Sequence, residues 1–205
     1  TALRLTTTRY YTPSGRLIKR EYEGKEKEAY QKEAFDRQEK EGENFEHKAE
    51  RDSTRPIFKT HAGRIVYGGG GITPDYVVKA PAFTASTQSI LRRGLVDQFV
   101  STYLDGKGLR IRTEYAKDWS RFKDSFTISA ELLEEFRSFI TKLEVKIDEK
   151  EFEKDLPFIK TRFKATFARN FWGNEGWYPM MLQVDTQFQK ALSLFPEAEK
   201  IANLN

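Results

Sequence analysis

The chain has 205 residues, of which 38% are hydrophobic and 14% aromatic, with sixteen Phe and three Trp. This length and composition predict a globular protein with a packed core, in one substantial domain or two small ones, and they exclude an intrinsically disordered chain. Lys and Arg number 35 against 31 Asp and Glu, so the formal net charge is only +4. Such a near balance gives little support to nucleic acid as a partner.

The residues that build metal, redox and disulfide sites are scarce. There is no cysteine, which excludes disulfides, thiolate zinc sites and cysteine nucleophiles. The two histidines, His47 and His61, do not make a histidine-rich site, and we expect no metal and no cofactor. No apolar run approaches the roughly 18 residues of a membrane span, and no leader peptide is recognisable. Membrane association is therefore not indicated, and a start at Thr1, inside a strand-like pattern, indicates a processed or truncated product.

The N-terminal residues carry the pattern of a strand followed by a turn. Residues 2–11, ALRLTTTRYY, alternate with a period of two and are rich in β-branched and aromatic types, which predicts a strand. Pro13, Ser14 and Gly15 then combine a fixed φ, a local hydrogen-bonding group and a permissive φ, so we expect the chain to turn there.

Further strands are predicted over 57–60, 64–67 and 75–79. Pro74 is expected at an edge or a bend, because proline cannot donate to a β ladder. A glycine run precedes it, for which we favour a tight turn or bulge over a phosphate-binding loop, since no Lys-Ser or Lys-Thr pair follows. The run consists of Gly68, Gly69, Gly70 and Gly71.

Residues 21–55 differ in character from the strands on either side. They contain twelve acidic and eight basic residues and few large apolar side chains. We predict a polar helix stabilised by pairs such as Glu28 with Lys32, and a loop beyond Gly42. The segment is interpreted as a surface insertion.

From Pro81 onwards the spacing of apolar residues changes to about 3.6, which is typical of amphipathic helices. We predict one helix from Ile90 to Tyr103, one that begins at Ser129, one that ends at Gly173 and a last one over 188–195.

The order of these elements predicts an α+β fold. Residues 1–80 are expected to form short, mostly antiparallel strands, interrupted by the charged insertion at about 21–55. Residues 83–205 are expected to form an all-helical C-terminal domain.

Basic and aromatic residues alternate over 160–172, as they do in proteins that bind single-stranded nucleic acid. On a helix, however, Phe163, Phe167 and Phe171 share one face, so packing in the core is the better interpretation. The aromatic cluster that follows allows an aromatic pocket, but we favour a helix–helix corner around Gly173. The cluster consists of Trp172, Trp177 and Tyr178, with Gly176 between them.

The spacing of the acidic residues and of the two histidines in the sequence does not predict a catalytic group. Glu134, Glu135 and the acids of 149–153 are expected on solvated helix faces. Asp148 and Glu151 have the spacing of a helix-capping box. His61 has no serine elbow or acidic partner near it in sequence, and His47 lies in the charged insertion. No catalytic residue is therefore predicted in this chain.

Two stretches, "ALRLTTTRYYTPSGRLI" and "GRIVYGGGGITPDYVV", resemble the carboxy-terminal processing peptidases, also called tail-specific proteases. The insertion and the helical tail are similar to a longer bacterial version of this family. The most diagnostic residues of the first stretch are Thr12, Pro13, Ser14, Gly15 and Arg16. Those of the second are the glycine run with Ile72, Thr73, Pro74 and Asp75.

The resemblance implies a serine endopeptidase of the bacterial periplasm or cell envelope that recognises the C-terminal end of protein or peptide substrates, usually with a PDZ domain. It implies a Ser-Lys mechanism. In the family, the serine and the lysine precede the strand that ends in TPSGR, so neither Ser14 nor a lysine of this chain takes a catalytic role. The chain is then the C-terminal portion of the enzyme, inactive alone, with the strands as a remnant of the core sheet. Strand edges exposed in this way are expected to cause self-association.

Two other functions stay open. The helical region could be a non-catalytic protein-binding or assembly module that uses Trp119, Trp177 or Tyr178 as an anchor. A nucleic-acid binder is the third interpretation, and it requires that the rings around Phe163 be exposed.

Overall fold

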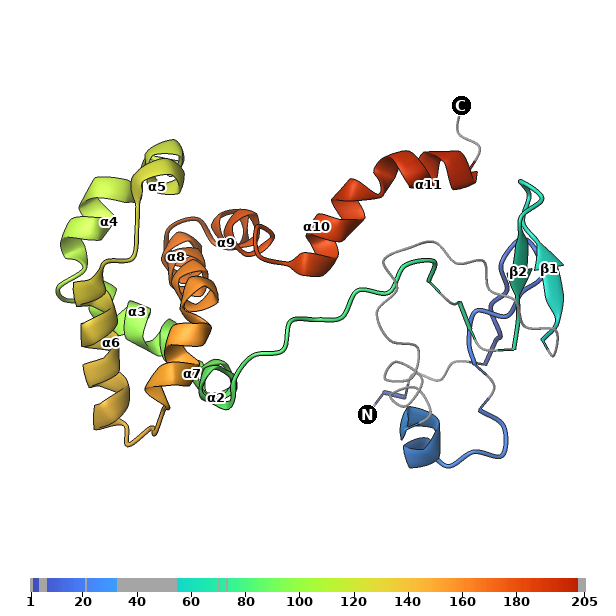
Figure 1. The fold of residues 1–205 in the computed structure, drawn as a ribbon, viewed down its shortest axis with the longest axis horizontal. Coiled ribbons are helices and arrows are strands. Elements are labelled where there is room, and N and C mark those ends of the chain that lie inside the picture. Colours follow the sequence, from blue (N-terminus) through green and yellow to red (C-terminus); the bar gives the residue numbers. More distant parts are fainter. Residues whose placement is uncertain are drawn as a thin grey trace. The chain divides into compact units, whose positions relative to one another are not determined.

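The computed structural model describes residues 2–3, 7–20, 22–32, 55–69, 71–72 and 74–202. The chain divides into two compact units, of which the first is Thr1–Lys79 with Lys190–Asn205 and the second is Ala80–Gln189. Figure 1 shows the strands in the first unit and helices throughout the second, which confirms the predicted α+β class with strands before helices. The sequence analysis placed all of 83–205 in one domain, whereas the last residues here fall in the first unit.

Two strands in the described residues form one antiparallel sheet. They are β1, Ile57–Lys59, and β2, Ile65–Tyr67. Phe58 pairs with Val66 in the centre of the register. Residues 7–10 form no strand, and of 75–79 only Val77 makes a β-bridge, so both predicted strands are wrong over their described parts. Residues 27–32 are helical, and the remainder of the predicted insertion, 33–54, lies outside the described residues.

Short and medium helices make up the rest of the chain. Their bounds are α2 Ala85–Arg92, α3 Leu95–Leu104, α4 Leu109–Tyr115, α5 Trp119–Ser125, α6 Ala130–Lys142, α7 Glu149–Lys154, α8 Leu156–Trp172, α9 Asn174–Met181, α10 Thr186–Ser193 and α11 Phe195–Ala202. The helix α6 begins after Ser129, whose side chain accepts from the Leu132 amide, as predicted. Among the described residues, no helix combines the length and apolar character that crossing a bilayer requires.

The predicted helix from Ile90 to Tyr103 is wrong, because it is two helices. Gly94 lies between α2 and α3 with φ +62°, in the left-handed region that glycine adopts without strain. The apolar pattern continues across the break because α2 and α3 bury residues in the same core. The predicted last helix is likewise divided at Leu194, between α10 and α11.

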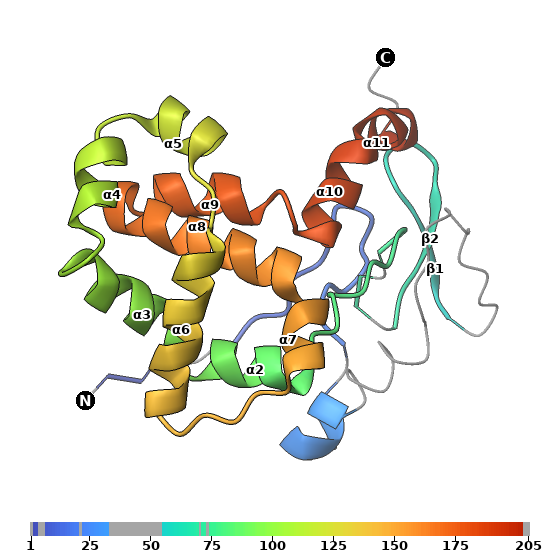
Figure 2. The same ribbon diagram turned by 60° about the vertical axis from the view of Figure 1, so that its left-hand side comes forward.

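The core of the second unit is a network of aromatic rings. Phe136 and Phe163 meet edge to face at 4.9 Å between ring centroids, and Phe99 meets Phe163 at 5.8 Å. Phe122 and Phe167 extend the network, and both are 0% exposed. The predicted core face of α8 is therefore confirmed. Figure 2 shows α8 as the longest helix of this unit, and it packs against both α3 and α9.

The corner between α8 and α9 depends on two glycines, as predicted. Gly173, with φ +62°, ends α8 and precedes α9. Gly176 is buried, and a Cβ atom there would lie 2.5 Å from the Ala168 carbonyl oxygen. The two helices approach so closely that no larger residue fits.

The N-terminus of α2 is held by carboxylates from the short helix α7. The Ser86 amide and hydroxyl both donate to Glu151 Oε2, at 2.9 and 2.6 Å. The Thr84 amide and hydroxyl both donate to Asp155 Oδ2, at 2.8 Å each. These acidic groups satisfy amides that have no partner within α2 and they lie at its positive end.

Glu151 was expected on a solvated face, and that prediction is wrong. Its neighbour Asp148 does cap α7 by accepting from the Glu151 amide at 3.0 Å. The Glu151 carboxylate does not complete the capping box, however, because it is engaged with α2. The Asp148 amide instead donates to the Ser86 hydroxyl at 2.9 Å.

Asp155 makes this junction sensitive to acid. Partial burial is the largest single effect and raises the pKa of its carboxyl group, but the hydrogen bonds from Thr84 and Thr87 and the charge of Lys154 together outweigh it and lower the pKa below its usual value. A lowered pKa in the folded state contributes stability above the ordinary aspartate pKa, and this contribution is lost as the pH falls through the folded value.

We predict that Asp155→Asn lowers the free energy of unfolding by about 1 kcal/mol at neutral pH, because a charge-assisted hydrogen bond becomes a neutral one. The difference from the wild type should shrink below about pH 4, where an ordinary aspartate titrates. Urea unfolding followed by circular dichroism at several pH values measures both effects. Asp124→Asn, at an exposed carboxylate in α5, is the matched control. A difference for Asp155→Asn that stays constant down to pH 2 would contradict the prediction.

Candidate functional site: two Thr-x-x-Gly-Arg turns

The TPSGR segment closes a tight turn through its own hydrogen bonds. The Thr12 amide donates to the Arg16 carbonyl and the Gly15 amide to the Thr12 carbonyl, both at 2.8 Å. The Arg16 amide also donates to Thr12 Oγ1 at 3.2 Å. Gly15 has φ +84°, which favours glycine. Tyr11 and Leu17 form an isolated antiparallel bridge just outside the turn, so the predicted turn at residues 13–15 is confirmed.

The turn between β1 and β2 has the same construction. The Thr60 amide donates to the Arg64 carbonyl and the Gly63 amide to the Thr60 carbonyl, both at 2.9 Å. The Arg64 amide donates to Thr60 Oγ1 at 3.1 Å, and Gly63 has φ +77°. This repetition was not predicted. The signal was present in the shared spacing Thr-x-x-Gly-Arg, in TPSGR and in THAGR.

The ring of Phe58 packs against residues of both motif stretches. A Cβ atom on Gly15 would lie 3.8 Å from the Phe58 ring, and one on Gly68 would lie 2.5 Å from it. The Arg16 guanidinium donates to the Tyr67 carbonyl at 3.4 Å. Residues of the first turn, of β1 and of the glycine run therefore pack at one place.

The second motif returns to the first beyond its glycines. Gly71 has φ +79°, and a Cβ atom there would lie 3.4 Å from the Ile18 carbonyl oxygen and 3.4 Å from Arg20 Cγ. Arg64 donates through both terminal nitrogens to the two carboxylate oxygens of Asp75. This two-pronged pair fixes the chain after Pro74 to the second turn.

Some motif residues lie elsewhere or cannot be placed. Ile72 is exposed, and Gly69 has φ +78°. Gly70 and Thr73 lie outside the described residues, as does His47. The Gly68 amide donates to the Pro56 carbonyl at 2.9 Å, which continues the pairing of β1 with β2 by one residue. The backbone bends at Gly69 and Gly71.

The site has the chemistry of a structural element. Ser14 Oγ lies 2.8 Å from Thr12 Oγ1, and no lysine or histidine in the described part of the chain is hydrogen-bonded to it. His61 is exposed in the second turn. Within the described ranges, no three His, Cys, Asp or Glu side chains gather as metal ligands would. Its hydrogen bonds and its salt bridge fix the path of the backbone. Among the described residues of the site, no nucleophile has an adjacent base.

The aromatic residues proposed as anchors in the helical region are mostly engaged. The guanidinium groups of Arg162 and Arg169 lie 4.3 and 5.4 Å from the centre of the Trp177 ring. Trp119 packs edge to face on Trp172 at 5.2 Å. Tyr178 is 55% exposed and is available to a partner.

Nucleic-acid binding along α8 would require exposed aromatic rings, and the central rings of this helix are not exposed. Phe163 and Phe167 are both fully buried, so no base can stack on them.

Comparison with known proteins gives one result. The model of a family of unknown function, DUF8443, matches residues 87–173, from within α2 to the corner after α8. No curated protein matches the chain. No solved structure matches it either. The matched segment contains most of the aromatic core and leaves both Thr-x-x-Gly-Arg turns outside.

We predict that Thr60→Val weakens the second turn by about 1 kcal/mol, because the Arg64 amide loses its side-chain acceptor while the β-branched shape is kept. Hydrogen exchange of the Arg64 amide, measured by NMR, should become about fivefold faster. Thr12→Val should have the same effect on the Arg16 amide. Thr7→Val, at an exposed position outside both turns, should change neither amide. Unchanged exchange in both turn variants would show that the hydroxyl groups do not hold the turns.

Proposed function

We propose that this chain is the C-terminal portion of a bacterial tail-specific serine endopeptidase. In the whole enzyme, a serine and a lysine supplied by other residues perform the hydrolysis, and this chain is structural or regulatory and has no activity alone. The observation that carries the proposal is the packing of both motif stretches on Phe58, with Arg16 bonded to the backbone of β2. Two sequence motifs of one protease core are expected to meet in space, and these two do.

The proposed role of the strand unit is to complete and brace the protease core. Its rigid parts are the two turns and the Arg64–Asp75 pair, which fix backbone rather than bind substrate. Protein or peptide substrates would bind the whole enzyme, in the periplasm or cell envelope.

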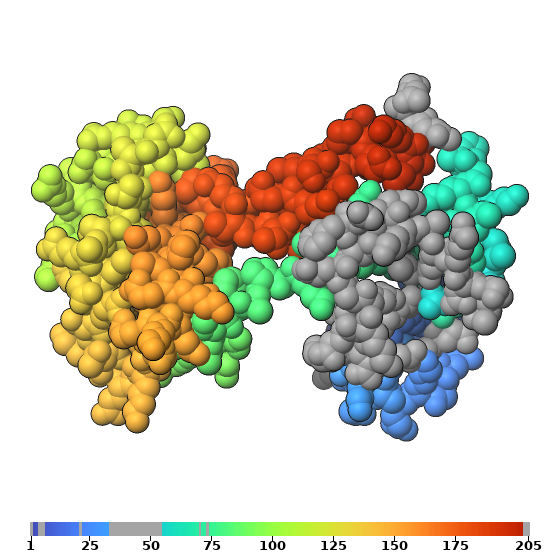
Figure 3. All heavy atoms as spheres, viewed as in Figure 1, coloured from blue at the N-terminus to red at the C-terminus, as the bar shows by residue number. Residues whose placement is uncertain are grey.

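A second candidate function is a non-catalytic assembly module, and one observation favours it. The helices α10 and α11 bury none of their residues, and Leu192 and Phe195 are 46% and 61% exposed. In Figure 3, α11 forms part of the visible surface. An amphipathic helix with an exposed apolar side suits contact with another protein.

The protease proposal is tested on the complete reading frame. We expect codons for a serine and, further on, for Gly-Lys-Gly with Gln four residues after the Lys, upstream of Thr1. The full product should cleave a reporter protein with an apolar C-terminal tail, and replacement of that serine by alanine should abolish cleavage. The 205-residue chain should not cleave it. Cleavage by the chain alone, or a reading frame without the serine and lysine, would overturn the proposal.

Self-association follows from the same proposal, because a core strand without its neighbours exposes unpaired backbone groups. Tyr10, Ile57 and Ile65 are 63%, 60% and 53% exposed in the strand unit. We expect sedimentation velocity to show dimers or larger species whose fraction rises with concentration. Ile57→Lys with Ile65→Lys should shift the distribution towards monomer. A strictly monomeric profile of the wild type at high concentration would contradict this expectation.

A further inference from the structure

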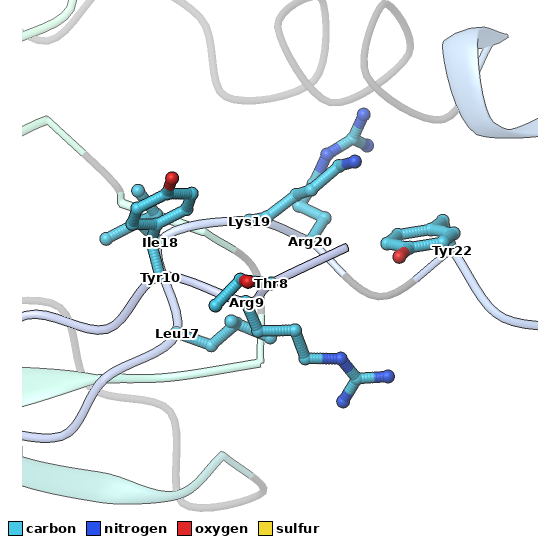
Figure 4. A pocket seen from close by; sticks show the side chains of 8 residues that line it. All are labelled: Thr8, Arg9, Tyr10, Leu17, Ile18, Lys19, Arg20 and Tyr22. Carbon is cyan, nitrogen blue, oxygen red and sulfur yellow. The ribbon is translucent and has the colours of Figure 1, made fainter. Parts of the chain in front are cut away.

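A cleft lies between the two arms of the TPSGR hairpin, where their pairing stops. The Ile18 amide donates to the Tyr10 carbonyl at 3.1 Å, and beyond this bond the arms diverge around a cavity of about 320 Å³. Both arms and Tyr22 line it, as Figure 4 shows. The volume of the cavity is at the lower end for ligand pockets, which suits a short ligand.

The lining is strongly basic. Arg9, Lys19 and Arg20 all contribute to it. Figure 4 shows Lys19 and Arg20 extending from one arm in a common direction, with Arg9 pointing away from them on the other arm. Only Arg9 has a carboxylate partner among the described residues, in an ion pair with Glu23.

Aromatic rings hold the other two cations, and neither has a carboxylate partner in the part of the chain that the structure describes. Lys19 Nζ lies 4.3 Å from the centre of the Tyr22 ring. Arg20 stacks at 4.3 Å on the Tyr30 ring and donates through Nη2 to the Tyr30 carbonyl at 3.2 Å. Its Nη1 is buried and has no hydrogen-bond partner within the described ranges. A buried guanidinium nitrogen without an acceptor favours an anionic ligand.

Apolar side chains also line the cleft, and they are partly exposed to solvent. Tyr10, Ile18 and Tyr22 are 63%, 43% and 46% exposed. Figure 4 places the rings of Tyr10 and Tyr22 at opposite ends of the cleft. Exposed rings at both ends with cations between them suit a ligand that carries apolar groups on each side of a negative charge.

We propose that this cleft binds a short extended peptide segment with acidic side chains between apolar ones. Its carboxylates pair with Lys19 and Arg20, and its apolar side chains pack on Tyr10 and Tyr22. The inference is independent of the proposed protease function, because it concerns only residues 8–10, 17–20 and 22 and no catalytic group.

The test uses the whole 205-residue chain, labelled with ¹⁵N, and the peptide acetyl-VEVDV-amide, whose ends carry no charge. We expect chemical-shift changes confined to residues 8–10 and 17–22. The neutral peptide acetyl-VQVNV-amide should bind about tenfold more weakly, because it lacks the charges that the cations attract. Citrate serves as a small anion without apolar groups.

Lys19→Glu should reduce the affinity for the acidic peptide about tenfold or more, since attraction becomes repulsion. Lys59→Glu makes the same charge change at an exposed position in β1, outside the cleft, and should leave the affinity within about twofold. Tyr22→Ala tests the apolar wall independently and should weaken binding several-fold. Unchanged resonances of β1 and β2 in each variant confirm that the unit still folds.

Three results would overturn the proposal. The first is an absence of shift changes in the cleft with the acidic peptide. The second is equal affinity of the acidic and neutral peptides, or of Lys19→Glu and wild type. The third is displacement of the peptide by citrate at equal concentration with the same shifts, which would identify a site for small anions instead of a peptide.

Discussion

The arrangement of the strand unit depends on the packing of the Phe58 ring against the backbone of glycine residues. Phe58 packs where Gly15 and Gly68 leave room, and a Cβ atom on Gly68 would overlap the ring. Because the two glycines belong to different stretches of the sequence, the ring joins the first turn to the glycine run. Arg16 and the Arg64–Asp75 pair then add directional bonds around that contact. Glycine is thus favoured at position 68 by packing against the ring and at position 15 by its positive φ.

Much of the helical region could be predicted from residue spacing alone. Phe163 and Phe167 are four residues apart on α8 and are buried, as a period of 3.6 requires. Ser129 and Gly173 mark helix ends through local capping and backbone geometry, which depend on neighbouring residues only. The helix α4 was not predicted because it is short and fully buries none of its residues, so that only Ile111 and Tyr115 mark its core-facing side.

What the sequence could not supply depends on contacts between distant residues. Glu151 has the composition and spacing of a solvated helix acid, yet its partner is Ser86, and nothing near Glu151 in sequence reveals that. The match between the two turns could have been found from Thr-x-x-Gly-Arg, but their meeting at Phe58 could not. The proposed protease function is based on residues 12–16 and 71–75, whereas DUF8443 matches residues 87–173 in the other unit.

The junction of α2 with α7 has a consequence for the order in which the second unit forms. An eight-residue helix is too short to persist alone in water, and the groups that satisfy the first amides of α2 are 65 residues further along the chain. The loop between them must close before α2 gains those bonds, and closure carries an entropy penalty that local helices do not have. The contact of Phe99 with Phe163 closes a loop of nearly the same length, and Ile90 of α2 and Phe152 of α7 belong to the same core. We therefore expect α2 to become ordered together with α7 and the aromatic core, and not as an independent helix.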